Sequence, residues 1–183
     1  SASRLIASAN YGGAATVEFL MDHEQNFYML EVNTRVQVEH PVTEMITGVD
    51  IVQEGIRVAA GEPLSIRQED ISVNGHAIEC RINAEDPDRN FMPQAGLIET
   101  FDSPGGPGVR LDSHARAGYR IPPNYDSMIG KLIVHAPTRE QAIARSLEAL
   151  RQFRIGPMKT SITLHQRLLD RPEFRSADFD IKW

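Results

Sequence analysis

A ten-residue run from Glu31 to His40 carries an unusual series of polar side chains. In an extended chain, alternate residues face the same side. One side of this run carries, in order, Glu31, Asn33, Arg35, Gln37 and Glu39. The other side is mostly apolar or β-branched. Carboxylates and amides bind metal ions and a guanidinium binds anions, so we interpret the polar side as one wall of an active site.

The length of this run divides its polar groups between two tasks. Fully extended, it would place Glu31 and Glu39 roughly 26 Å apart, which is too far for both to bind one metal ion. Pro41 favours extended geometry in the residue before it and can begin a helix at its first turn. We therefore predict a strand with Glu31 and Asn33, a turn that presents residues 35–39, and then a helix. The strand would bind a cation and the turn an anion.

Glu18 is the predicted partner of Glu31. Two β-favouring runs flank the segment Asp22–Gln25, which is typical of a hairpin turn. If Asp22 faces Phe27, the antiparallel register places Glu18 directly opposite Glu31. Their Cβ atoms would then be only ~5 Å apart, and like charges at that distance repel.

A divalent cation between the two glutamates would remove this repulsion, and Asn33 adds a further oxygen. A ligand set of Glu18, Glu31 and Asn33 contains oxygen donors and no His or Cys, which favours Mg²⁺ or Mn²⁺ over zinc. The alternative interpretation is a solvated pair of glutamates on an exposed hairpin.

Three stretches of the chain together resemble one family. They are AATVEFL from Ala14, EVNTRVQVEHPVTE from Glu31 and ECRINAEDP from Glu79. The chain resembles biotin carboxylase, the ATP-grasp component of acetyl-CoA, propionyl-CoA and pyruvate carboxylases, from about Tyr11 to about Thr163. The HPVTE segment is more similar to the acyl-CoA group. The resemblance implies Mg²⁺ (or Mn²⁺), ATP, and biotin carried as a substrate on a carrier protein.

The resemblance also implies a role for each matching residue. Glu18 and Glu31 match the family's magnesium ligands, with Asn33 as an auxiliary ligand. Arg35, Gln37 and the backbone of Val38 match the bicarbonate pocket. Glu39 matches the proposed general base, and Arg81 matches the arginine that stabilises the biotin enolate. The catalytic residues would therefore be Arg35, Glu39 and Arg81.

The implied chemistry suits these residue types. A guanidinium can hold bicarbonate by two oxygens while a carboxylate removes its proton. Magnesium offsets charge as the phosphoryl group is transferred. Carboxyphosphate would then release carbon dioxide, which the ureido nitrogen of biotin attacks, and a second fixed cation would stabilise the ureido oxygen.

Each feature also has a structural alternative. Arg35 and Glu39 are four residues apart and on a helix could form a solvated ion pair. Arg81 could pair with Glu79 on the same strand face. Cys80 falls on the opposite, apolar face and is predicted to lie in the core. The glycine- and proline-rich run 104–108 lacks the Lys-Ser/Thr that follows a phosphate loop, so we expect a turn.

Composition narrows the class of protein. Hydrophobic residues make up 41% and charged residues 24%, as in an ordinary globular chain. A single cysteine fits a reducing compartment, so we expect a cytoplasmic protein, or a mitochondrial matrix protein in a eukaryote. A net charge of -6 argues against nucleic acid as a partner. The sequence contains no transmembrane run, which argues against a membrane partner.

The predicted fold class is α+β. We expect the C-terminal half of an ATP-grasp domain at residues 1–62, a connection at 63–74, and a mostly β biotin carboxylase C-terminal domain with terminal helices at 75–183. Asp50 with Gln53 predicts a helix start, and Gly61 its end. The later elements expected are strands near 76–83, 96–101, 109–112 and 128–135, a helix from the Thr138 cap to near Gly156, and a helix near 160–170.

The sequence has no glycine-rich lid of the ATP-grasp type, so we expect a fragment of a larger enzyme that is inactive or nearly so by itself. Its expected partners are the rest of the carboxylase chain, the biotin carboxyl carrier protein and the carboxyltransferase component. A homodimer through the C-terminal domain is also implied, although Pro107 stands where relatives often carry an aromatic residue, while Arg110 matches. The rival interpretations are another ATP-grasp carboxylate or bicarbonate ligase, and a non-catalytic assembly or dimerisation module.

Overall fold

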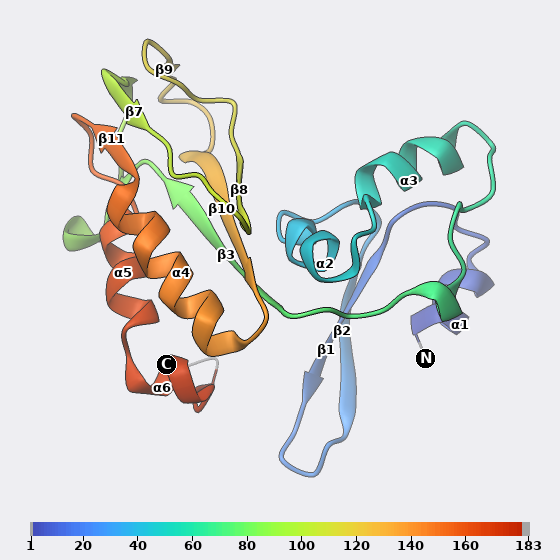
Figure 1. Cartoon of the computed structure of the whole chain (residues 1–183). Coiled ribbons are helices and arrows are strands. Elements are labelled where there is room, and N and C mark those ends of the chain that lie inside the picture. The colour runs from blue at the N-terminus through green and yellow to red at the C-terminus, as the bar shows by residue number, and fades with distance from the viewer. Residues whose placement is uncertain (1, 181–183) are drawn as a thin grey trace. The chain divides into compact units, whose positions relative to one another are not determined.

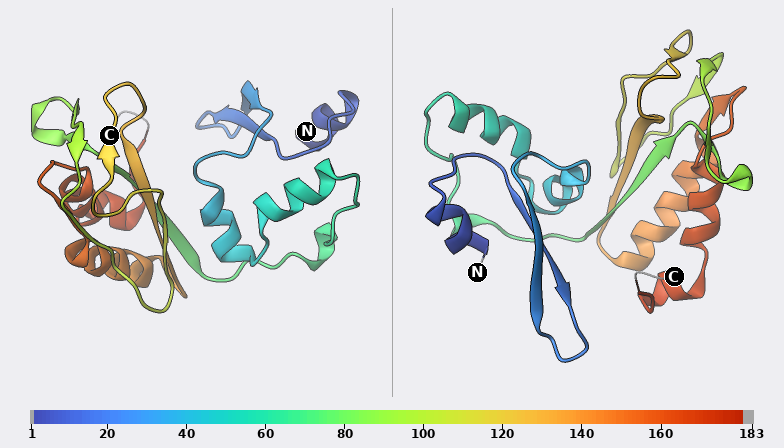
Figure 2. Two further views of the ribbon diagram at one scale, coloured as in Figure 1. Left: turned by 90° about the horizontal axis from the view of Figure 1, so that it is seen from above. Right: turned by 180° about the vertical axis from the view of Figure 1, so that it is seen from behind.

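The computed structural model describes residues 2–180, and contacts divide the chain into two compact units, 1–73 and 74–183. Figures 1 and 2 show the two units from three directions. The first unit contains α1 (Ala2–Ser8), β1 (Thr16–Met21), β2 (Phe27–Asn33), α2 (His40–Thr47), α3 (Ile51–Ala59) and the short 3-10 helix Gln68–Asp70. No helix among residues 2–180 has both the length and the apolar character needed to cross a bilayer.

The first unit is an antiparallel hairpin of β1 and β2 followed by two short helices. The Asp50 side chain accepts a hydrogen bond from the Gln53 amide at 2.8 Å, so the predicted start of α3 is confirmed. Gly61 follows the helix with a φ of +85°, a conformation that favours glycine. The hairpin exposes a series of large apolar side chains: Leu20, Met21, Phe27, Tyr28, Met29 and Leu30.

The second unit is built around a three-stranded antiparallel sheet in the order β3-β10-β8. These strands are β3 (His76–Asn83), β8 (Val109–Asp112) and β10 (Met128–Ala136). Small two-stranded pairs surround the sheet: β4 (Glu85–Asp86) with β5 (Met92–Pro93), β6 (Gly96–Leu97) with β9 (Arg120–Ile121), and β7 (Thr100–Asp102) with β11 (Arg154–Gly156). A 3-10 helix spans Pro87–Arg89.

Three helices complete the second unit: α4 (Arg139–Gln152), α5 (Ile162–Leu169) and α6 (Pro172–Ser176). Helix α4 packs on β10 and β3, and α5 lies beside α4 and β3 (Figure 1). Apart from Pro41 of α2, the buried aliphatic and aromatic side chains of residues 2–180 belong to this unit. They include Ile82, Ile98, Leu132, Ile143 and Leu150. Cys80 is 3% exposed in the same core, as predicted, and burial raises the pKa of its thiol to about 12.

Two predicted elements of the second unit were wrong in detail. The helix after Thr138 ends at Gln152 rather than near Gly156, because Phe153 is buried against Phe101 and turns the chain into β11. The single strand expected at residues 96–101 is divided into β6 and β7, which pair with different partners. Ile98 is fully buried at the division. The glycine-rich run 104–108 forms a turn, as expected, with the Val109 amide bonded to the Gly106 carbonyl.

Candidate active site

The predicted contact between Glu18 and Glu31 is confirmed, but the register that was assumed for it was wrong. Met21 pairs with Phe27, so the strands leave the turn one residue out of the assumed register. A bulge then places one extra residue, Leu30, on β2, and Glu18 faces Glu31. Since a slip of one residue turns each side chain to the opposite face, the bulge decides whether the two carboxylates meet.

Asp22 fixes the tight end of the hairpin. Its Oδ1 accepts hydrogen bonds from the amides of Glu24 and Asn26, both at 2.9 Å, and its Oδ2 accepts one from the Asn26 side chain at 3.0 Å. These bonds, led by the one from the Asn26 side chain, lower the pKa of Asp22. Gln25 adopts a φ of +64° in this turn. The side-chain bonds of Asp22 therefore fix the pairing of the two strands next to the turn. The bulge at Leu30 shifts that pairing by one residue further along the hairpin.

The strand end and the following turn bring five polar side chains together. The amide nitrogen of Asn33 donates to Glu18 Oε1 at 3.0 Å and to Glu31 Oε1 at 2.9 Å. Gln37 Nε2 donates to the same Glu18 oxygen at 3.1 Å. Arg35 Nη2 lies 3.4 Å from Asn33 Oδ1. The sequence thus predicted the members of this cluster, and the structure shows how they contact one another.

The cluster fits a hard divalent cation. The Asn33 NH₂ group bridges the two carboxylates, which is where a shared cation would lie, and turning the amide over would present Oδ1 instead. Among residues 2–180, no group of three or more His, Cys, Asp or Glu side chains is arranged to hold a metal ion. Mg²⁺ usually keeps several waters and takes one or two carboxylates together with phosphate oxygens, so two glutamates suffice for it.

Beside this cluster, the motif turn lines a cavity of about 390 Å³. Arg35, Gln37, Glu39 and His40 all contribute to its wall. Val38 lies half-buried in the same turn but outside the cavity lining. The segment 34–39 is not helical, so the ion pair considered for Arg35 and Glu39 on a helix does not apply. A guanidinium, an amide and a carboxylate around one small cavity can bind and deprotonate a small oxyanion.

Sequence reasoning missed His40, which contacts this turn, and Glu44, one helical turn further along α2. His40 Nδ1 lies 2.6 Å from the Gln37 carbonyl, and since a carbonyl only accepts, Nδ1 carries the proton. Glu44 is buried and accepts a hydrogen bond from the Ile51 amide at 2.9 Å. The His–x–x–x–Glu spacing on α2 places both on one helix face, and this spacing is the signal that could have identified them.

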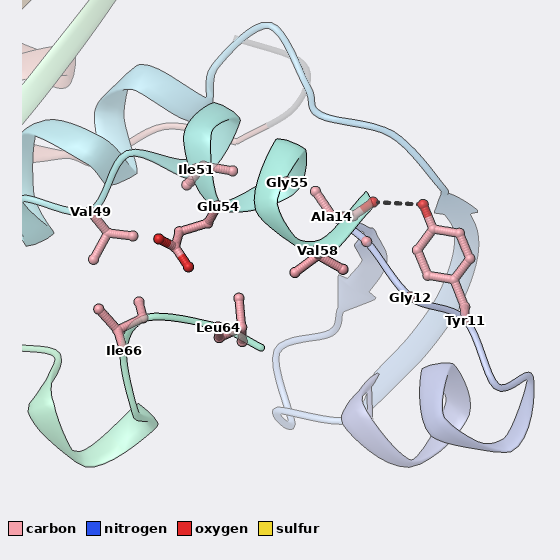
Figure 3. Close-up of a pocket in the computed structure, with 11 residues that line it drawn as sticks. Tyr11, Gly12, Ala14, Val49, Ile51, Glu54, Gly55, Val58, Leu64 and Ile66 are labelled. Carbon is pink, nitrogen blue, oxygen red and sulfur yellow. Dashed lines mark hydrogen bonds between the residues drawn. The ribbon is translucent and has the colours of Figure 1, made fainter. Parts of the chain in front are cut away.

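A second cavity of the first unit, of about 440 Å³, is mostly apolar (Figure 3). Its carboxylate, Glu54, accepts hydrogen bonds from the Ser65 hydroxyl at 2.6 Å and the Ser65 amide at 2.9 Å, and these bonds lower the pKa of Glu54. Tyr11, at the edge of the cavity, donates to the carbonyls of Ala14 and Thr34. Tyr11 thereby ties the segment before β1 to the end of β2.

Arg81 belongs to the second unit, where it is exposed on β3 and pairs in register with Lys131. Its carbonyl is held by two side chains from the N-terminal end of α5. Ser161 Oγ donates to it at 2.8 Å, and His165 Nε2 lies 2.7 Å from it. Sequence reasoning missed both contacts, because Ser161 and His165 lie 80 and 84 residues beyond Arg81.

Two half-buried histidines of this unit make its stability depend on pH. Burial lowers the pKa of His165, against a smaller opposing effect of its bond to the Arg81 carbonyl. Burial and then the Arg139 charge lower the pKa of His76. A histidine with a lowered pKa binds more protons when unfolded, so stability is complete above the unfolded pKa near 6.5 and is lost as pH falls through it.

We therefore expect the free energy of unfolding to fall between pH 7.5 and 5.5, as measured by urea denaturation of the chain. The double variant H76Q/H165Q should show a shallower fall over the same range. An equally steep fall in the double variant would contradict this assignment.

Comparison with known proteins relates both units of the chain to known families. The family model for the biotin carboxylase C-terminal domain matches residues 79–183, and that for the ATP-binding domain of the carbamoyl-phosphate synthase L chain matches residues 1–67. The biotin carboxylase of Nostoc sp. is 56% identical over 165 residues, which are 90% of this chain and 37% of the relative. Biotin carboxylase 1 of Bacillus subtilis is 52% identical over 184 residues, covering 100% of this chain and 41% of the relative.

Solved structures show the same likeness. The biotin carboxylase domain dimer of Hydrogenobacter thermophilus 2-oxoglutarate carboxylase, in complex with MgADP, ADP and bicarbonate, is 48% identical with a TM-score of 0.96 and covers 100% of this chain and 40% of that one. The Campylobacter jejuni biotin carboxylase is 43% identical with a TM-score of 0.94 over the same shares of the two chains.

The fold and the site thus define an ATP-grasp protein. Within that class, the chain belongs to the biotin carboxylase family. It spans about two fifths of the length of the relatives it matches.

Proposed function

We propose that the whole protein is a biotin carboxylase, which uses ATP and bicarbonate to carboxylate the ureido nitrogen of biotin through carboxyphosphate. The observation that carries this proposal is one continuous set of contacts in the first unit. The facing glutamates Glu18 and Glu31 are joined through Asn33 to Arg35, and Arg35 lines a cavity together with Gln37 and Glu39. A cation site and an anion site therefore adjoin, as phosphoryl transfer to bicarbonate requires.

Glu18, Glu31 and Asn33 would hold the magnesium ion. When bound, the ion offsets negative charge on nucleotide phosphates. Glu18 accepts a hydrogen bond from the Gln37 amide, and this bond remains when the Asn33 amide turns over to present its oxygen, so the carboxylate of Glu18 is already oriented before a cation binds. Such preorganisation reduces the reorganisation needed at the moment of reaction.

Arg35, Gln37 and Val38 would bind bicarbonate, and Glu39 would remove its proton. Glu39 is exposed at the N-terminal boundary of α2 and makes no side-chain cap to that helix. Its carboxylate shares the cavity wall with Arg35 and Gln37, which suits a base acting on an anion held there. Arg81 would stabilise the biotin enolate that forms after carbon dioxide is released.

The family relation extends the proposal to the wider protein. We propose residues 1–62 as the C-terminal part of an ATP-grasp domain, 63–74 as a connection and 75–183 as the biotin carboxylase C-terminal domain. The partners would be the rest of the carboxylase chain, the biotin carboxyl carrier protein and the carboxyltransferase component, with a homodimer. The HPVTE segment is more similar to the acyl-CoA group of carboxylases, and within that group we propose an acetyl-CoA carboxylase of fatty acid biosynthesis in the cytoplasm.

Biotin-stimulated, bicarbonate-dependent ATP hydrolysis tests this function. We expect the full-length polypeptide that carries this sequence to hydrolyse ATP faster when biotin is added and only when bicarbonate is present. We expect residues 1–183 alone to show little or no turnover. Hydrolysis that ignores biotin would reduce the assignment to an ATP-grasp ligase of another specificity.

Replacing Glu31 by glutamine tests the metal site. We expect E31Q in the full-length polypeptide to weaken Mn²⁺ binding in the presence of ADP by about tenfold or more, because one of two charged ligands is lost. Electron paramagnetic resonance of Mn²⁺ measures the free ion. The matched control is E24Q, the same change of charge in the turn of the same hairpin, which should leave Mn²⁺ affinity unchanged. Equal losses in both variants would exclude a specific site at Glu31.

A further inference from the structure

The outer edge of β3 is closed by residues at the N-terminal end of α5. Ser161 makes two backbone-like contacts with Asn83: its amide donates to the Asn83 carbonyl at 2.9 Å, and its Oγ accepts from the Asn83 amide at 2.9 Å. The same hydroxyl donates to the Arg81 carbonyl, which His165 Nε2 also approaches at 2.7 Å. An edge strand normally leaves such backbone groups without a partner strand. Here Ser161 and His165 bind the outward-facing groups of Arg81 and Asn83 instead.

The inner edge of the same segment is paired irregularly. Asn83 pairs with Met128 and Ile82 pairs with Gly130, so a bulge at Ile129 interrupts the ladder beside Arg81. A bulge bends and twists the strand locally and leaves a residue unpaired. The position of the Arg81 backbone therefore depends in part on its hydrogen bonds to residues at the start of α5.

We propose that Ser161 and His165 are positioning residues that fix the backbone of Arg81, and through it the guanidinium that acts on biotin. This inference rests on the proposed function, because it assigns the two residues to the biotin step of that reaction. Ser161, His165 and Arg81 all belong to the second unit.

The chemistry of the two donors supports this role. Both bonds end on one carbonyl, and a carbonyl has two lone pairs that can be satisfied together. His165 is a donor at Nε2 when neutral, and burial favours the neutral ring. A displacement of about 1 Å at a group that contacts a reacting centre can reduce the rate by about a hundredfold, so anchors outside the site can have large effects.

The test compares two rates in the full-length polypeptide: bicarbonate-dependent ATP hydrolysis with and without biotin. We expect S161A and H165L to lower the ratio of the stimulated to the unstimulated rate by about tenfold. H165Q should retain most of the ratio, because the glutamine amide can still donate to the Arg81 carbonyl. The matched control is T163A, which removes an exposed hydroxyl from the same helix and should leave the ratio unchanged.

Hydrogen exchange of the Asn83 amide gives a readout that does not depend on activity. S161A removes the acceptor of that amide, so its exchange should accelerate. Faster exchange with an unchanged ratio would overturn the proposal, and so would an equal fall of both rates, which would show a role in folding alone. S161A removes a single oxygen atom and keeps the test valid if H165L does not fold. A wild-type enzyme without biotin stimulation would overturn the proposed function itself, while the exchange result would still report on the contact.

Discussion

E39Q in the full-length polypeptide is expected to lower the rate of bicarbonate-dependent ATP hydrolysis by about 10²- to 10⁴-fold, the range typical of a lost general base. Glutamine keeps the size of the side chain but cannot accept a proton. The neighbouring groups Arg35 and Gln37 remain in the cavity wall, so bicarbonate should still bind. The loss should therefore appear in kcat more than in the KM for bicarbonate.

Steady-state assays with varied bicarbonate measure both parameters. The matched control is E62Q, which makes the same change of charge at an exposed position after α3 and should leave the rate within about twofold of the wild type. Binding of ADP should be unaffected in both variants. A loss of less than about fivefold in E39Q would show that another group removes the proton.

Replacing Leu132 by alanine is expected to have a large effect on the stability of the second unit rather than on activity. It is fully buried in β10, between Cys80 of β3 and Leu111 of β8 in the register of the sheet. L132A should reduce the free energy of unfolding by about 3 kcal/mol, because apolar burial is lost and a cavity remains beneath α4. Urea denaturation followed by far-ultraviolet circular dichroism measures the change.

The control for the core is L97A, since Leu97 is 40% exposed in a short strand at the edge of the unit. This variant should lose less than about 1 kcal/mol. If the two variants were equally destabilised, the sheet β3-β10-β8 would not be the centre of the folding unit.

The local features of the fold followed from short-range chemistry. Asp50 caps α3 and Thr138 caps α4 because a side-chain oxygen three residues before an amide satisfies it without help from the rest of the chain. Cys80 lies in the core because the strand period of two sets it on the same face as Ile78 and Ile82. Such features depend on a few neighbouring residues and are therefore readable from sequence.

Features that depend on distant contacts were not readable. The end of α4 is set by the packing of Phe153 against Phe101. The helix propensity of the residues before Gly156 does not reveal this contact. The bulge at Leu30 depends on how the Asp22 turn and the strand pattern are reconciled across the hairpin. Ser161 and His165 reach Arg81 only because α5 lies along β3.

The sequence alone predicted which residues form the candidate site, because Glu18, Glu31, Asn33, Arg35 and Gln37 belong to two short segments rich in metal- and anion-binding side chains. Tertiary structure decided how these residues contact one another: the amide of Asn33 bridges both carboxylates, and Arg35 leads from that bridge to the cavity at Glu39. Tertiary structure also decided what holds Arg81. The sequence shows which side chains are present, because residue identity is local. Only the tertiary structure shows the hydrogen bonds between segments, because their geometry depends on the packing of the whole unit.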